Sequence, residues 1–258
     1  MLVKATDTTG FAVQASDGTL GTVSDLLFDD ASWTVRWLVV ETGNWWADHR
    51  VLIPASALGH PDTATRTFPV SLTMAQVKDS PDVDTHRPVS RQFESSAYDY
   101  YGFSPYWGTD LYVGGFSYWG GMVPMAPSLE TERREDEIAR MQRQNDDPNL
   151  RSVAEISSYH IHATDGEIGH LSDVLIEDSD WKLRYLIVNT SNWWQGKEVL
   201  ISPRSTESIR WTEHLIYLRV NRDRVRTSPE YDASRPITTA FDTEIASHYG
   251  PTKPANVA

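Results

Sequence analysis

The sequence of 258 residues contains no cysteine. Disulfides, thiolate nucleophiles and cysteine-ligated metal sites are therefore excluded. Basic residues are few, because 23 Lys and Arg stand against 36 Asp and Glu and give a net charge of −13. Nucleic-acid phosphates and anionic lipids both select basic surfaces. The acidic balance thus argues against a nucleic-acid partner and against simple electrostatic docking on a membrane.

Long apolar runs are also missing. No stretch of the sequence reaches the roughly 20 apolar residues that span a bilayer. The first ten residues, MLVKATDTTG, lack the apolar segment of a secretory signal. We therefore expect a cytoplasmic protein of bacterial type. Its 40% hydrophobic and 11% aromatic content is typical of a folded globular chain.

One segment of the chain occurs twice. Residues 17–53 read DGTLGTVSDLLFDDASWTVRWLVVETGNWWADHRVLI, and residues 165–201 read DGEIGHLSDVLIEDSDWKLRYLIVNTSNWWQGKEVLI. They align without a gap at a constant offset of 165 − 17 = 148 residues. The same offset aligns the Ser-Pro pair at 80–81 with that at 228–229. Self-similarity at a fixed spacing indicates one structural unit made twice.

Each unit has the pattern of a small β-domain. Asp17-Gly18 lies between two alternating runs and is the strongest short signal for a β-hairpin. Gly21, alone within the second strand, predicts a β-bulge. About five or six short strands at hairpin spacing favour a small closed barrel over an open sheet.

The segment 33–40 predicts the most informative strand. At a period of two, one face carries Trp33, Val35, Trp37 and Val39, and the other face becomes apolar towards its end. A strand that is apolar on both faces needs cover from outside its own sheet.

A helix that follows each unit is the candidate for this cover. Apolar side chains recur there at a spacing of four, on one side of the predicted helix. The two sets are Phe93, Ala97 and Tyr101 in the first unit, and Phe241, Ile245 and Tyr249 in the second.

The units and their connection divide the chain into three parts. We place the first unit with its helix at 1–102 and the second, with its helix and tail, at 150–258. Residues 103–149 form a linker that is first rich in aromatic residues and glycine and then highly charged. We expect the aromatic part to pack on a barrel or a partner. The charged part fits a solvated helix or a disordered tether equally well.

The units share the pattern DG–x2–G–x3–D–x3–DD/ED–x2–W–x2–R–x–LVV, in which the second unit has LIV for LVV, followed by WW and VLI. This pattern resembles the PRC-barrel domain, which forms the barrel of the cytoplasmic H subunit of the photosynthetic reaction centre. The domain also occurs in a ribosome-maturation factor and in stand-alone bacterial proteins. The resemblance implies a mainly β fold of two small PRC-type β-barrels in tandem, each with short C-terminal helices. Known members act mostly as protein-contact or assembly modules, and the resemblance supplies no catalytic residues.

The paired tryptophans are the candidate interaction residues. Trp45-Trp46 and Trp193-Trp194 occupy equivalent positions in the two units. In an extended segment, adjacent side chains point to opposite faces, so one of each pair can reach the surface. Exposed tryptophan is typical of hot spots at protein contacts. The alternative is that these residues plug the end of a barrel.

Asp25 and Asp173 lie within predicted strands. We expect structural ion pairs with Arg36 and Arg184 on the neighbouring strands. Acid–base chemistry or Ca²⁺ binding is the alternative, but the first also needs a cleft with an orienting group and the second a denser set of oxygen ligands.

Three histidines gather in the second unit. His160 and His162 share a strand face at i, i+2 and are weak candidates for binding a transition metal. A simple hairpin places His170 on the opposite face, unless a bulge at Gly169 changes this. The alternative is that these are solvent-facing strand residues without a metal, and we assign no metal or other cofactor.

No nucleophile elbow, phosphate-binding loop, dinucleotide fingerprint or zinc-protease motif occurs in the sequence. We therefore expect a non-enzymatic protein-interaction or assembly module with an unidentified protein partner. The alternatives are a peripheral H-subunit-like component of a membrane complex, a metal or small-ligand sensor, and a ribosome-maturation-type factor. Peripheral membrane association and homodimer formation are both left open.

Overall fold

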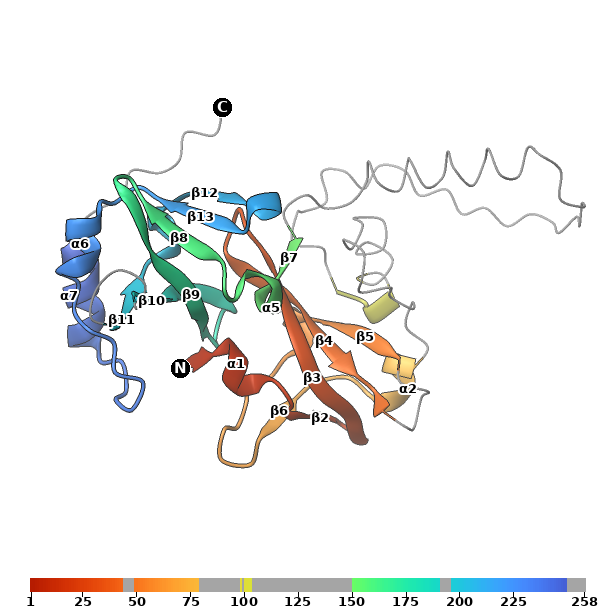
Figure 1. The fold of residues 1–258 in the computed structure, drawn as a ribbon. Helices are drawn as coiled ribbons and strands as arrows, with labels where there is room; N and C mark the ends of the chain where they lie inside the picture. Colours follow the sequence, from red (N-terminus) through yellow and green to blue (C-terminus); the bar gives the residue numbers. More distant parts are fainter. Residues whose placement is uncertain (44–48, 79–97, 99, 104–149, 191–195, 250–258) are drawn as a thin grey trace, which may run out of the picture.

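The computed structural model describes residues 1–43, 49–78, 98, 100–103, 150–190 and 196–249 (Figure 1). The fold is mainly β. The first unit comprises β1 (Leu2–Lys4), α1 (Ala5–Thr8), β2 (Ala12–Ala15), β3 (Gly18–Asp29), β4 (Thr34–Glu41), β5 (Arg50–Pro54), β6 (Thr67–Pro69) and α2 (Met74–Lys78).

The second unit repeats this order and adds β12, and its last helix α7 corresponds to a segment of the first unit that lies largely outside the described residues. Its elements are β7 (Leu150–Ser152), α5 (Val153–Ile156), β8 (His160–Ala163), β9 (Gly166–Glu177), β10 (Lys182–Asn189), β11 (Glu198–Ile201), β12 (Thr206–Arg210), β13 (Leu215–Leu218), α6 (Arg222–Arg226) and α7 (Thr239–Tyr249). None of the helices in the described ranges is long and apolar enough to cross a bilayer.

The strands join in one sheet of 13 strands, and its main path runs β12-β13-β8-β9-β10-β4-β3-β2-β6. Pairing is antiparallel except between β2 and β6 and between β8 and β13. The predicted pair of separately closed barrels is therefore not what the described strands form. They form one open sheet, whose main path passes from one unit to the other where β10 pairs with β4. Each unit also lends its first strand to the other.

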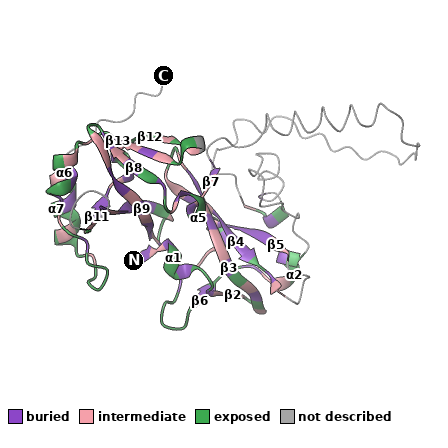
Figure 2. Cartoon of the chain, viewed as in Figure 1, coloured by how far each residue is buried: buried purple, intermediate pink, exposed green. Residues whose placement is uncertain are grey.

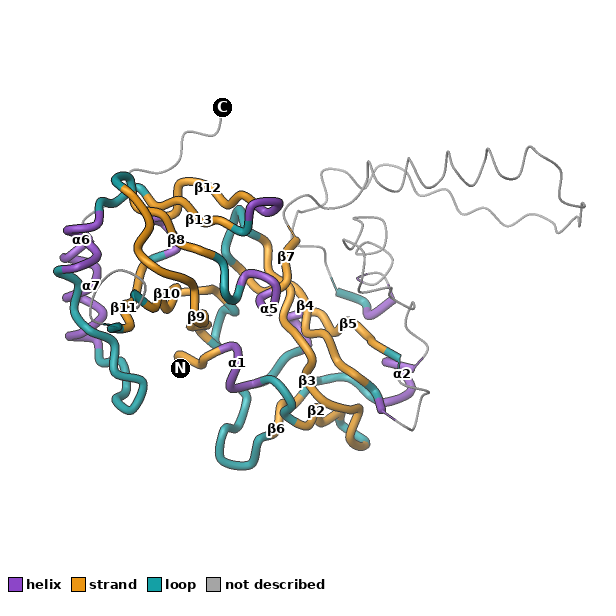
Figure 3. The backbone as a smooth tube through the Cα atoms, viewed as in Figure 1, coloured by secondary structure: helices purple, strands orange, loops and turns teal. Residues whose placement is uncertain are grey.

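This exchange of first strands is reciprocal. Strand β1 pairs with β9 through Leu2↔Glu177, and β7 pairs with β3 through Leu150↔Asp29. The two pairings are the same contact shifted by 150 − 2 = 148 and 177 − 29 = 148 residues, with the units interchanged. Figure 3 shows the short helices α1 and α5, which follow the exchanged strands, next to each other between the units.

A second contact joins the units at the start of β4 and β10. The N–H of Val35 donates to the carbonyl of Trp181, and the N–H of Leu183 donates to that of Trp33, both at 2.8 Å. Trp33 and Trp181 adopt left-handed backbone angles, with φ of 53° and 56°. Such angles cost of order 1–3 kcal/mol in residues other than glycine and require support from packing. The Trp181 ring receives this packing support from Phe68 of the first unit, on which it stacks at 5.6 Å between ring centroids.

The predicted bulge at Gly21 is confirmed, and Gly169 repeats it. The register between β2 and β3 shifts beside Gly21, as that between β8 and β9 shifts beside Gly169. A Cβ at Gly21 would lie 2.0 Å from the carbonyl oxygen of Glu41, and one at Gly169 would lie 1.9 Å from that of Asn189. No side chain fits at either position.

A further bulge changes the predicted faces of β4. The register passes from Phe28↔Val35 to Leu27↔Trp37, so Arg36 is an extra residue. Val35 consequently belongs to the main core, while Trp37 packs in a separate cluster. Trp37 is nevertheless fully buried, because the ring of Tyr98 covers it at 4.8 Å.

The predicted cover of the second unit is confirmed by α7. Ile245 and Tyr249 are buried in the main core, and Phe241 packs at its edge. In the first unit Tyr101 is buried too, whereas Phe93 and Ala97 lie outside the described residues. Figure 2 shows the buried residues concentrated along the strands in both units.

Because the core and the exchanged strands cross between the units, the chain should survive a cut in its linker. A protease site inserted between residues 104 and 149, once cleaved, is expected to leave two fragments that elute together in size-exclusion chromatography. The uncut chain gives the reference volume. Fragments that separate under native conditions at micromolar concentration would contradict the exchange.

Candidate functional site: a groove shared by both units

The two carboxylates that the sequence places within strands, Asp25 and Asp173, bind the segments that the units exchange. Asp25 accepts hydrogen bonds from the hydroxyl of Ser152 and from the N–H of Ala154 at 3.1 Å. Asp173 accepts from the hydroxyl of Thr6 and from its N–H at 3.3 Å. In each case the donors belong to the segment that the other unit contributes.

The predicted ion pairs of Asp25 with Arg36 and of Asp173 with Arg184 are therefore corrected. Arg184 pairs with Asp180 at 2.9 Å, and Arg36 donates to the hydroxyl of Ser32 at 3.0 Å. The bulges at the two arginines explain the error, since each shifts the face on which the following side chains lie.

Burial raises the pKa of both Asp25 and Asp173 above the ordinary aspartate value of 3.8. The hydrogen bonds that they accept favour the charged form and offset only part of this effect. Asp173 is 4% exposed, so its carboxylate lies almost entirely away from water.

The histidines do not assemble a metal centre. His160 Nδ1 lies 2.9 Å from a carboxylate oxygen of Glu167, and the ring of His162 lies 5.5 Å from that of Tyr217. The bulge beside Gly169 places His170 directly opposite His160, on the same face of the sheet. Within the described ranges, no group of three His, Cys, Asp or Glu residues is arranged to hold a metal ion.

The interaction residues predicted from the sequence, Trp45, Trp46, Trp193 and Trp194, lie outside the described residues. Their role in partner contact stays a prediction. The linker from residue 104 to 149 also lies outside them.

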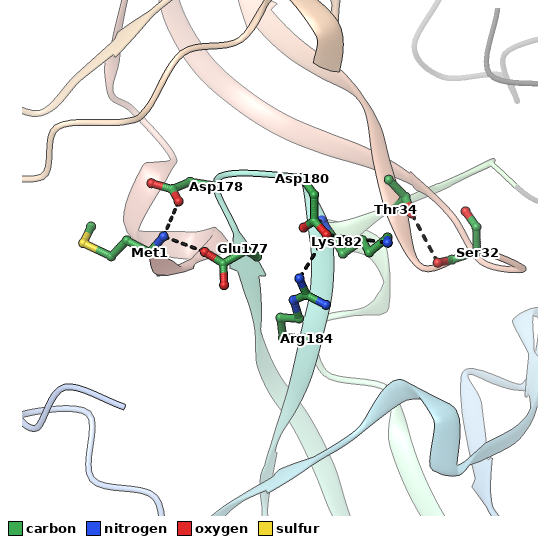
Figure 4. A network of polar contacts seen from close by, with 8 residues as sticks. All are labelled: Met1, Ser32, Thr34, Glu177, Asp178, Asp180, Lys182 and Arg184. Carbon is green, nitrogen blue, oxygen red and sulfur yellow. Dashed lines mark hydrogen bonds and ion pairs between the residues drawn. The ribbon is translucent and has the colours of Figure 1, made fainter. Parts of the chain in front are cut away.

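A polar network fixes the N-terminal segment to the second unit (Figure 4). The amino group of Met1 pairs with Glu177 at 2.5 Å and with Asp178. His60 Nδ1 reaches the second carboxylate oxygen of Asp178 at 3.0 Å. Burial raises the pKa of Asp178, but the hydrogen bonds from the amino group and His60 outweigh it and leave that pKa below its ordinary value.

Beside this network lies a groove of about 1670 Å³. One wall is β1 with the turn 31–33 of the first unit, and the other is the segment 231–239 with α7 of the second unit. Its floor includes the start of β10 and the 3₁₀ helix η4 (Pro203–Ser205). The sequence analysis missed this groove, because its walls come from segments whose proximity depends on the strand exchange.

The groove combines apolar surface with charge. Trp33, Leu183, Tyr231 and Ile237 are among its apolar and aromatic residues. The hydroxyl of Tyr185 on β10 donates to Asp242 of α7, which ties the floor of the groove to one wall. Burial is the main cause that raises the pKa of Tyr185, and the contact with the Asp242 carboxylate raises it further. Such a surface can hold an amphipathic ligand through both kinds of contact.

The raised pKa values of Asp25 and Asp173 predict a definite pH dependence. Between the ordinary and the raised pKa, the folded state binds more protons than the unfolded chain. Stability therefore falls as the pH rises through this interval, which begins at about pH 4. Urea unfolding at a series of pH values measures this effect. As the pH rises, the free energy of unfolding should fall less for the double variant Asp25→Asn, Asp173→Asn than for the wild type.

An alanine variant provides the contrast. Asp25→Ala leaves the donors of Ser152 and Ala154 without their acceptor, and is expected to lower the unfolding free energy by about 1–3 kcal/mol. An asparagine variant whose stability falls with pH as steeply as that of the wild type would show that these carboxyls titrate normally.

Comparison with known proteins agrees with this description of the first unit. None of the curated proteins matches the chain. Residues 2–70, from β1 to the end of β6, match the family model of the PRC-barrel domain, as the sequence pattern predicts. This part of the chain is therefore a PRC-barrel domain.

Proposed function

We propose that this chain is a non-enzymatic protein-interaction or assembly module, built from two PRC-type units in tandem. The observation that carries the proposal is the size and origin of the groove. Its volume of about 1670 Å³ exceeds the roughly 300–1,000 Å³ that is typical of pockets for small molecules. A groove of this size suits a segment of a protein partner.

The exchange gives this function a structural basis. The groove is lined by Met1 to Lys4 and by the turn at Trp33 from the first unit, whereas most of its lining comes from the second. It is therefore complete only when the two units are assembled. The PRC-barrel domain at residues 2–70 fits an interaction module in general terms. In this proposal the paired tryptophans supply a further contact surface.

Filling the groove tests the proposal. Ala246 is exposed on α7 and lines the groove, so Ala246→Trp adds bulk there without removing a described polar contact. Tagged wild-type chain is used to capture its partner from cells that express it naturally, and the partner is then purified. The variant is expected to bind this partner at least about tenfold more weakly, a loss of about 1.4 kcal/mol.

Ser247→Trp is the matched control. Ser247 is the next residue of the same helix and is exposed, but it does not line the groove. Both variants should unfold at the same temperature. Equal binding of the partner by both variants would contradict a role for the groove, and turnover of a metabolite by the purified chain would contradict the non-enzymatic function.

A further inference from the structure

We infer that the groove binds an extended, acidic segment of a partner protein, which adds as a strand to the free edge of β1. The inference rests on the proposed function and names the chemistry of its partner. Three features of the groove support it: a strand edge, an excess of cationic side chains and a buried hydroxyl that lacks a partner.

The strand edge comes from the exchange. Among the described strands β1 pairs only with β9, so one of its edges carries no neighbouring strand. The N–H of Asp178 donates to the carbonyl of Met1 at 3.1 Å, and Val3 lies opposite Ile176. Hydrogen-bonded pairs alternate along an antiparallel ladder, so the N–H and C=O of Leu2 point away from β9. An edge of this kind is a template for an added peptide strand.

The side chains that line the groove include more cations than carboxylates. The five cationic side chains are Lys4, Lys182, Arg184, Arg204 and Arg235, and the three carboxylates are Asp7, Glu177 and Asp242. The amino group of Met1 already neutralises Glu177, and the hydroxyl of Tyr185 engages Asp242. Although the net charge of the chain is −13, cations thus outnumber carboxylates among the lining side chains, and a ligand that carries carboxylates complements those cations that have no ion pair.

The cations differ in how freely they can meet a ligand. Lys182 and Arg184 share Asp180, and Arg235 pairs with Asp232. Arg204 is exposed, and its guanidinium makes no ion pair within the described part of the chain. A guanidinium binds a carboxylate through two parallel hydrogen bonds, so Arg204 is the main anchor for an acidic side chain.

The residue after this arginine supplies an unused donor. Ser205 lines the groove and is fully buried, and its hydroxyl has no hydrogen-bond partner among the residues that the structure describes. A buried hydroxyl without a partner is unfavourable, because it has lost its hydrogen bonds to water. If an occupant beside Arg204 opens the groove around this hydroxyl, a carbonyl or carboxylate oxygen of the occupant would supply the missing acceptor.

Two labelled octapeptides test the chemistry. An alternating Val-Glu peptide presents carboxylates on one side of a strand and apolar groups on the other, and an alternating Val-Lys peptide reverses the charge. Fluorescence anisotropy with the full chain is expected to show binding of the Val-Glu peptide alone. Its affinity should fall with added salt, because exposed charges are screened. Arg204→Glu should weaken it at least about tenfold.

Arg210→Glu is the charge-matched control, since Arg210 is exposed and lies outside the groove. It should leave the affinity for the Val-Glu peptide unchanged, and Ala246→Trp should abolish binding. Hydrogen exchange should become slower at the amide of Leu2 when the Val-Glu peptide is bound. Equal binding of both peptides, equal effects of the two arginine variants, or an unchanged Leu2 amide would each overturn the inference.

These failures can be told apart from failure of the proposed function. If Ala246→Trp blocks capture of the natural partner while the Val-Glu peptide binds no better than Val-Lys, the groove is an interaction site and its ligand is not acidic. If Ala246→Trp changes neither capture of the natural partner nor binding of the Val-Glu peptide, both the function of the groove and the inference are wrong.

Discussion

The reciprocal exchange of the first strand and helix is the contact on which the rest of the structure depends. Each unit offers a desolvated carboxylate, Asp25 or Asp173, to donors of the segment that arrives from the other unit. Without that segment the carboxylate would lose the hydroxyl and N–H groups that donate to it, at a cost of about 1–3 kcal/mol. The stability of each unit is therefore linked to the presence of its partner, although 71 residues separate α2 at Lys78 from β7 at Leu150.

The same exchange creates the groove. Strand β1 belongs to the chain segment that matches the PRC-barrel family model, yet it pairs with β9 of the second unit. There it meets α7 and the segment before it across an open space that neither unit could enclose alone. The contact that stabilises the two units thus also places a strand edge beside the cations of the second unit, and the proposed binding site lies at this junction.

Turn, bulge and helix patterns in the sequence correctly predicted the features of this fold that depend on residues close together in the chain. Asp17-Gly18 gives the hairpin, Gly21 gives the bulge, and the spacing of Phe241 and Ile245 gives the buried face of α7. The exchange was not predictable in this way, because a strand as short as Leu2–Lys4 carries no pattern that specifies its partner. The partners of Asp25 and Asp173 and the lining of the groove depend on that long-range pairing, so they could not be derived from the sequence either. The bulge at Arg36 shows a related limit. An extra residue in a strand breaks the alternation of its faces, so a strict period of two assigned Val35 and Trp37 to one face when they pack in different clusters.

The differences between the two units indicate where their roles diverge. Core positions stay apolar across the offset, as with Val35 and Leu183 or Leu38 and Leu186. The groove does not follow this rule, because Arg204 and Ser205 stand where the first unit has Ser56 and the buried Ala57. Lys182 likewise replaces Thr34. Packing constrains the core of a repeated unit in both copies, whereas a surface is free to change in one of them. At the groove, the second unit thus carries two cations and a hydroxyl where the first unit has Thr34, Ser56 and Ala57, while the two units share an apolar core.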